Sequence, residues 1–260
     1  MSSPVVSLGA VLPIILSIPH ASSRIPEDLE GKVMLSDHDL LSYADLYTDR
    51  IYDVPNTYRV MADVSRVFVD VNRAPDDISK EYERNEEGVD VHCTWDGKPI
   101  YAAEPTAAEV AERIRLHHDA FHERIDAYIP EAQFLIDCHS YLPVGPPLKA
   151  DAGKPRPDIC LGNMNYSTCT REHTVFFRDF FERHGFSVSI NFPYQGKYTL
   201  GRHCHRRRIP HFLVPGIQIE LNQKLYADAK TLEPRLDALK DLSQLMEKVV
   251  HEFAEEFARQ

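Results

Sequence analysis

The sequence predicts a protein of the α/β class, organised as one domain over residues 1–260. Two short apolar runs, at 11–18 and 134–136, have the length of buried strands and are too short for helices. Stretches with a helical apolar stripe separate and follow them, at 37–52, 105–129 and 229–260. Polar side chains come directly after both apolar runs, where open α/β sheets place their ligands. No internal repeat, low-complexity segment or linker divides the chain.

Composition excludes several classes of protein. The chain has 260 residues, and its formal net charge of −11 argues against general binding to nucleic acid or to a membrane surface. No apolar run approaches the roughly 20 residues of a membrane span. The start lacks the basic and apolar regions of a secretory signal. Five cysteines without a CxxC spacing do not suggest a disulfide framework, so we expect a cytoplasmic protein.

Histidines follow both predicted strands. His20 comes after the run 11–18, and Asp137, His139 and Ser140 come after the run 134–136. Residues 137 and 139 are two apart, so on a strand they point to the same side. A neutral imidazole can bind a divalent metal, and a nearby carboxylate can hold its tautomer. The two histidines either converge on one metal or are separate hydrogen-bonded residues at strand ends.

Residues 37–52 are predicted to form an amphipathic helix. Asp45 and Asp49 lie four apart and would share one helix face. They are either two solvated acids or, because the helix follows the His20 loop closely, a source of a carboxylate for the same metal.

Residues 58–62 and 67–71 are predicted as two strands, possibly a hairpin, which ends in Asn72 and Arg73. Arg73 can offer a bidentate donor to a substrate carboxylate, or it forms a surface salt bridge. The acidic, irregular stretch 76–100 contains the only tryptophan, Trp95, and is interpreted as a lid over the site.

The long helix 105–129 contains His118 and His122 at a spacing that could bind a metal. No HExxH pattern surrounds them, so we interpret them as structural or surface residues. Further strands are predicted at 158–162 and 187–190, and a helix with a core-forming aromatic stripe at 170–184.

The C-terminal half offers three more candidate groups. The loop 191–199 contains a glycine and could close on a ligand, and the basic stretch 202–208 is either solvated or places an arginine in an anion pocket. Residues 214–222 alternate with period two, so Gln218, Glu220 and Asn222 share one face of a strand. Glu220 is either solvent-facing or the general base beside a metal.

An ordered set of motifs resembles the N-formylglutamate amidohydrolase family over about residues 14–226. The motifs are Pro19-His20-Ala21-Ser22-Ser23-Arg24-Ile25-Pro26, Asp45-Leu46-Tyr47-Thr48-Asp49-Arg50-Ile51-Tyr52, Val71-Asn72-Arg73, Asp137-Cys138-His139-Ser140, Tyr194-Gln195-Gly196-Lys197-Tyr198 and Gln218-Ile219-Glu220-Leu221-Asn222. The resemblance implies a three-layer α/β/α sandwich with a mixed central sheet, similar to zinc carboxypeptidases and aspartoacylases. It also implies a zinc ion, or another divalent metal, held by two histidines and one carboxylate.

The resemblance assigns roles to particular residues. His20 and His139 are the implied histidine ligands, and Asp45 is preferred to Asp49 as the third, because Ser23 stands where the carboxypeptidase relatives have a glutamate. Many family members also have Pro-His-Ser-Gly where this chain has Pro-His-Ala-Ser. Glu220 is the implied general base, with Arg73 also in the catalytic set. The implied substrate contacts are Asn72, Arg73, Ser140, Tyr194 and Arg202.

The implied function is metal-dependent hydrolysis of the amide bond of an N-acyl amino acid such as N-formylglutamate, a step of histidine degradation. The partner is then a small acidic molecule, with no nucleic acid or membrane. Alternatives are a related amidohydrolase for another N-acyl amino acid and a non-catalytic small-molecule or metal-binding protein. A ureohydrolase needs a further aspartate at the position of Tyr141. One shared metal requires the two imidazoles to lie within about 8 Å, since Zn–N bonds are roughly 2.1 Å.

Overall fold

A computed structural model describes residues 11–29, 32–78 and 87–258. Within them, six strands form one sheet in the order β2-β1-β3-β6-β4-β5. The strands are β1 (Ile14–Ile18), β2 (Tyr58–Met61), β3 (Phe134–Tyr141), β4 (Ile159–Gly162), β5 (Val188–Ile190) and β6 (Gly216–Asn222). Neighbouring strands are parallel except β4 and β6, which are antiparallel. The sheet is therefore mixed, as predicted.

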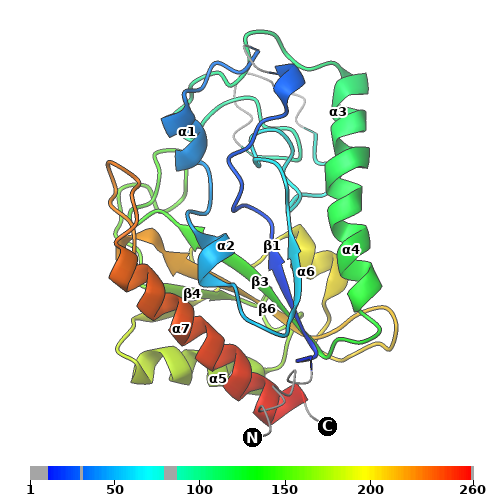
Figure 1. Ribbon diagram of the computed structural model, residues 1–260, viewed down its shortest axis with the longest axis vertical. Helices are drawn as coiled ribbons and strands as arrows, with labels where there is room; N and C mark the ends of the chain where they lie inside the picture. Colours follow the sequence, from blue (N-terminus) through cyan, green and yellow to red (C-terminus); the bar gives the residue numbers. More distant parts are fainter. Residues whose placement is uncertain (1–10, 30–31, 79–86, 259–260) are drawn as a thin grey trace, which may run out of the picture.

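Helices cover both faces of this sheet (Figure 1). One face packs against α2 (Thr48–Ile51), α5 (Arg171–Arg183) and α7 (Leu236–Phe253). The other packs against α4 (Ala120–Tyr128) and α6 (Tyr198–His203), and α3 (Ala107–Arg113) leads into α4. Because successive strand side chains point to opposite faces, Ile14 and Leu16 enter the first core and Ile15 the second. The predicted three-layer α/β/α arrangement is confirmed.

The parallel register brings the ends of β1, β3 and β6 to the same edge of the sheet. Ser17 pairs with Asp137 across β1 and β3, and His139 pairs with Glu220 across β3 and β6. His20 follows β1 by two residues. The prediction of adjacent strands that end at the two histidines is confirmed, although β3 extends to Tyr141 and includes His139 itself.

The prediction of a single helix over residues 37–52 is wrong. Helix α1 (Asp37–Ser42) begins with a capping box from Ser36, and α2 starts only at Thr48. In the turn between them, the Asp45 amide donates to the His20 carbonyl (2.9 Å), and Tyr47 has a positive φ of 59°. The chain leaves the helical path here to bring residue 45 against the His20 loop, so Asp45 and Asp49 do not share a helix face.

The prediction of a strand over residues 67–71 is also wrong. These residues form turns, and the apolar side chains of Val67, Phe68 and Val69 are buried in small clusters beside the sheet. The Asp70 amide donates to the Val89 carbonyl (2.9 Å), and its carboxylate accepts from the Asn72 amide (2.9 Å). Residues 67–71 are mostly apolar because they are buried, although they do not pair with the sheet. Their sequence therefore resembles that of a strand.

Most remaining elements agree with the predictions within a few residues, but the closing helix starts seven residues later than predicted and α6 was not predicted. The helix predicted at 105–129 is α3 and α4 joined by a π-helical segment, η3 (Ile114–Asp119). The closing helix α7 begins at residue 236 and ends in η5 (Ala254–Ala258). Short 3₁₀ helices are η1 (Glu27–Leu29) and η4 (Gln223–Leu225). In the predicted lid, 79–86 lie outside the described residues. Among the helices that are described, none is both long and apolar enough to cross a membrane.

Candidate metal centre and active site

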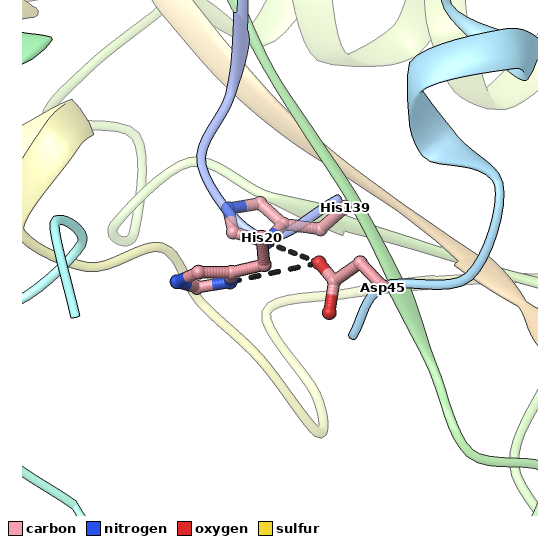
Figure 2. Close-up of side chains that lie close together, drawn as sticks. All are labelled: His20, Asp45 and His139. Atoms are coloured by element: carbon pink, nitrogen blue, oxygen red, sulfur yellow. Dashed lines mark hydrogen bonds and ion pairs between the residues drawn. The ribbon is translucent and has the colours of Figure 1, made fainter. Parts of the chain in front are cut away.

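Three buried side chains from separate elements meet at the edge of the sheet (Figure 2). Nδ1 of His139 lies 2.8 Å and Nδ1 of His20 lies 3.6 Å from the same carboxylate oxygen of Asp45. The two imidazole centroids are 4.9 Å apart, within the limit set by a shared metal. One potential ligand atom from each residue lies within 4.8 Å of the others. Two imidazoles and one carboxylate are a donor set that suits zinc.

Carboxylates behind the histidines set which ring nitrogen faces the centre. Nε2 of His20 donates to Asp70 (2.8 Å), and Nε2 of His139 donates to Asp137 (3.0 Å) when the proton is there. This tautomer leaves both Nδ1 atoms free to bind a metal, as in carboxylate–histidine–zinc arrangements. Nδ1 of His20 is buried and has no hydrogen-bond partner among the described residues. Because buried polar atoms are nearly always paired, this orphaned nitrogen fits a metal ligand.

The supporting carboxylates are themselves held by hydrogen bonds. Asp137 accepts from the Ser17 hydroxyl (2.8 Å) and Asp70 from the Arg66 guanidinium (2.7 Å). Burial favours the neutral acid at Asp70, but Arg66 and its other cationic neighbours hold the pKa well below its usual value. Asp70 therefore places a negative charge beside His20.

Glu220 lies beside this group on β6, directly opposite His139 in the sheet. It is 5 % exposed, and Gln218 donates to its Oε1 at 2.8 Å. Burial raises the pKa of Glu220 to about 8, against the opposing effect of His139, and the charge of Asp45 adds to the increase. A carboxylate with a raised pKa is better matched to proton transfer near neutral pH.

The pocket in front of these residues is lined with cations although the chain is acidic. Arg73 is 11 % exposed, and its Nε has no hydrogen-bond partner within the described ranges. Glu87 hydrogen-bonds Lys149 and lies within 3.7 Å of Arg73 and 3.6 Å of Lys197. Among the described residues, the cations that line the pocket are Arg66, Arg73, Lys149, Arg156 and Lys197. Asp45, Glu87 and Glu220 also line the pocket, so the unpaired Nε of Arg73 is the cationic group best placed to bind an anionic ligand.

Another part of the pocket wall is formed by Arg156 and the rings of Tyr141 and Tyr194. Arg156 is held by two hydrogen bonds to Asp151 (2.6 and 3.1 Å), and its guanidinium carbon lies 5.5 Å from the Tyr141 ring centroid and 5.1 Å from that of Tyr194. Burial raises the pKa of Tyr194 to about 12, so its hydroxyl keeps its proton at neutral pH. Tyr194 can therefore donate a hydrogen bond to a ligand.

Most residues selected from the sequence lie together here. The predicted residues that line the pocket are His20, Asp45, Asn72, Arg73, His139, Ser140, Tyr194 and Glu220. Arg202 does not line it, because α6 directs its side chain to Asp126 on α4 (2.9 Å). Asp49 lies on α2 outside the pocket.

Sequence reasoning missed several pocket residues that come from irregular segments. Arg66 stands directly before the apolar run 67–71 that suggested a strand, and Asp70, which supports His20 without lining the pocket, lies within that run. Glu87, Lys149 and Arg156 belong to loops in which only their charge distinguishes them. One signal was available, since Asp70 stands two residues before Asn72 and faces the same site.

Comparisons with known proteins agree with the resemblance found in the sequence. Residues 12–227 match the sequence model of the family described as N-formylglutamate amidohydrolase. The crystal structure of N-formylglutamate amidohydrolase from Ralstonia eutropha JMP134 is similar with a TM-score of 0.81 and 22% identity, over 96% of each chain. A gene product from Agrobacterium tumefaciens has a TM-score of 0.64 and 21% identity, over 94% of this chain and 92% of that one. No curated protein matches. At these identities the structural likenesses show a shared fold.

Proposed function

The chain belongs to the N-formylglutamate amidohydrolase family, whose members hydrolyse a carbon–nitrogen bond other than a peptide bond, and we propose that it cleaves an acidic N-acyl amino acid such as N-formylglutamate with a zinc ion. The main support is the convergence of His20, His139 and Asp45 beside Glu220, in a pocket lined with cations. The proposed metal ligands, the candidate base and the candidate anion-binding groups all line the same pocket.

The proposed ligands are Nδ1 of His20, Nδ1 of His139 and the Asp45 carboxylate. A zinc or other divalent ion bound there supplies Lewis acidity, which polarises the amide carbonyl and lowers the pKa of the attacking water. Asp70 and Asp137 keep the Nε2 protons in place, so that each imidazole presents its Nδ1 lone pair to the centre.

Glu220 is the proposed general base. Its carboxylate accepts a proton from the attacking water, whose oxygen forms the new bond to the carbonyl carbon. The same carboxyl group then delivers that proton to the amide nitrogen as the carbon–nitrogen bond breaks. The products are the acyl acid, formate in the case of a formyl group, and the free amino acid. Gln218 holds the Glu220 carboxylate in place through its hydrogen bond (2.8 Å).

Substrate binding is assigned to groups around the pocket. Arg73 offers its guanidinium to a substrate carboxylate, which also supplies a partner for the unpaired Nε. Asn72, Ser140 and Tyr194 are proposed to orient the substrate. The cations Lys149 and Lys197 add to the field that favours an acidic ligand.

A hydrolysis screen tests this function. Zinc-loaded protein is incubated with N-formylglutamate, with N-formyl derivatives of neutral amino acids and with N-acetylglutamate, and release of the free amino group is measured. We expect turnover with a preference for the acidic substrates. Binding of these compounds without turnover would support the alternative of a non-catalytic binding protein. Equal kcat/KM for neutral and acidic substrates would show that the cationic pocket does not select them.

Replacement of Arg73 by lysine tests the proposed carboxylate contact. The variant keeps the positive charge but loses the planar, bidentate donor, so we expect KM for the acidic substrate to rise by about 10-fold with a smaller change in kcat. Arg183→Lys is the control, because Arg183 pairs with Glu252 on the surface far from the pocket. An unchanged KM in Arg73→Lys would contradict the assignment.

The raised pKa of Glu220 predicts the acid side of the pH profile. A general base works in its deprotonated form, so kcat/KM should increase as the pH rises through the pKa of this group. Burial raises that pKa from the ordinary 4.5 to about 8 in the metal-free protein, and a bound dication favours the carboxylate and lowers it. We expect the midpoint of the acid limb to lie between these values. A profile that is flat down to pH 4.5 would exclude Glu220 as the titrating group.

A further inference from the structure

Three buried histidines lie close together outside the pocket. His118 is on η3, His122 on α4 and His203 at the end of α6, and each is at most 1 % exposed. The rings of His118 and His122 are 4.6 Å apart, and those of His122 and His203 are 5.0 Å apart. None of the three lines the pocket. Their contacts therefore need a separate explanation.

Two of these histidines bind the backbone on either side of Asn72. His122 Nε2 donates to the Val71 carbonyl (2.8 Å), and His118 Nε2 donates to the Arg73 carbonyl (2.9 Å). Because a carbonyl only accepts, each Nε2 must carry a proton. The backbone of the turn is thus fixed from behind at two successive points, while the side chains of Asn72 and Arg73 are on the pocket side.

The third histidine contacts the remaining ring nitrogen of the second. With its proton on Nε2, His122 has a free acceptor at Nδ1, which receives a hydrogen bond from His203 Nε2 (2.8 Å). Burial, reinforced by the charge of His203, lowers the pKa of His122 to about 2, so His122 remains neutral. His203 Nδ1 in turn contacts the Asp126 carboxylate (3.1 Å). The Val71 carbonyl, which can only accept, thus fixes the His122 proton on Nε2, and His203 contacts the other ring nitrogen.

The Asn72–Arg73 turn, which these histidines hold, contacts the proposed ligand His139 through the side chain of Asn72. The side-chain oxygen of Asn72 accepts from the Thr199 amide (2.9 Å), so its nitrogen must face the opposite way. That nitrogen lies 3.3 Å from Asp137 Oδ2 and 3.0 Å from His139 Nε2. A shift of the Asn72 backbone would therefore move a donor away from the carboxylate that fixes the His139 tautomer.

We infer that His118 and His122 are positioning residues, which hold the Asn72–Arg73 turn so that Asn72 supports His139 and Arg73 faces the substrate. This inference rests on the proposed function, because it assigns the turn to the same metal site. The histidines contact neither metal ligand nor substrate and act only through the backbone of the turn.

The test compares two substitutions at each histidine. His122→Leu removes the donor to Val71, whereas His122→Gln keeps an N–H donor near the position of Nε2. We expect His122→Leu to weaken zinc affinity, measured by chelator competition, and to lower kcat by about 10-fold each, the lower end of effects seen for residues that support metal ligands. His122→Gln should recover most of both losses, and the absorption spectrum of the cobalt-substituted protein should change in His122→Leu alone. The pair His118→Leu and His118→Gln repeats the test at the Arg73 carbonyl if His122→Leu does not fold.

His184→Leu is the matched control. His184 Nδ1 also donates to a backbone carbonyl, that of Phe180 (2.7 Å), but it lies at the end of α5 on the other face of the sheet. It should lower the melting temperature without changing zinc affinity or kcat. Folded leucine variants at 118 and 122 with the zinc affinity and kcat of the parent would overturn the inference, and so would losses that glutamine does not relieve.

The outcomes also separate this inference from the proposed function. A parent protein that binds zinc but hydrolyses no substrate would refute the proposed reaction, while zinc affinity and the cobalt spectrum of the variants would still decide the role of the histidines. A parent that hydrolyses substrate, with variants that match it, would refute the inference alone. A parent that binds no zinc would refute both.

Discussion

Replacement of Glu220 by glutamine is expected to abolish nearly all turnover while the protein stays folded and retains its metal. The change is nearly isosteric, and the side-chain oxygen of the new residue can still accept the hydrogen bond from Gln218. An amide, however, cannot take the proton from the attacking water, and loss of general-base assistance typically costs about 10²–10⁴ in rate. Steady-state kinetics with the zinc-loaded variant measure this loss.

Stability gives a second readout for the same variant. A carboxyl group whose folded-state pKa is raised contributes stability that is present at low pH and lost as the pH rises through that value, here about 8. Glutamine has no charged form, so above that pH the metal-free variant should be at least as stable as the metal-free parent. Turnover within a few-fold of the parent would exclude Glu220 as the base.

Alanine substitution of His20, Asp45 or His139 is expected to remove stoichiometric zinc and, with it, activity. Each change deletes one of three proposed ligands, so the affinity should fall by more than the roughly 10–100-fold typical of residues that only support ligands. Circular dichroism would show that the fold remains, because these side chains lie at the edge of the sheet and not in its apolar cores. Metal content after dialysis is the direct measurement.

Asp49→Ala is the matched control for Asp45→Ala. It removes the same charge four residues away, from a side chain on α2 that does not line the pocket. This variant should keep its zinc and its kcat. Full zinc occupancy in Asp45→Ala, with loss in Asp49→Ala, would reverse the assignment of the carboxylate ligand.

The sheet and its two histidines could be predicted because the information is local. Buried parallel strands have short apolar runs, and the residues that follow them must lie at one edge of the sheet. The period-two pattern at 214–222 placed Glu220 with Gln218 on one face, and the structure adds that this face is buried against the pocket. Local periodicity therefore located three of the four central side chains.

The other parts of the site depend on contacts that local periodicity cannot show. Asp45 was selected from a single predicted helix, but the structure places it in a turn, because its amide donates to the carbonyl of His20, which is distant in the sequence. Asp70 lies in an apolar run that is buried without pairing in the sheet. Arg202 has a suitable charge, but the orientation of α6 directs it to Asp126. The positive pocket is assembled from loops by tertiary structure alone.

Anomalous diffraction from crystals of the zinc-loaded protein, measured at the zinc absorption edge, tests the central claim most directly. We predict one peak per chain at the edge of the sheet, about 2.0–2.1 Å from Nδ1 of His20 and Nδ1 of His139 and about 2.0–2.2 Å from a carboxylate oxygen of Asp45. A peak elsewhere, or none at this position while zinc is present in solution, would contradict the proposed metal centre.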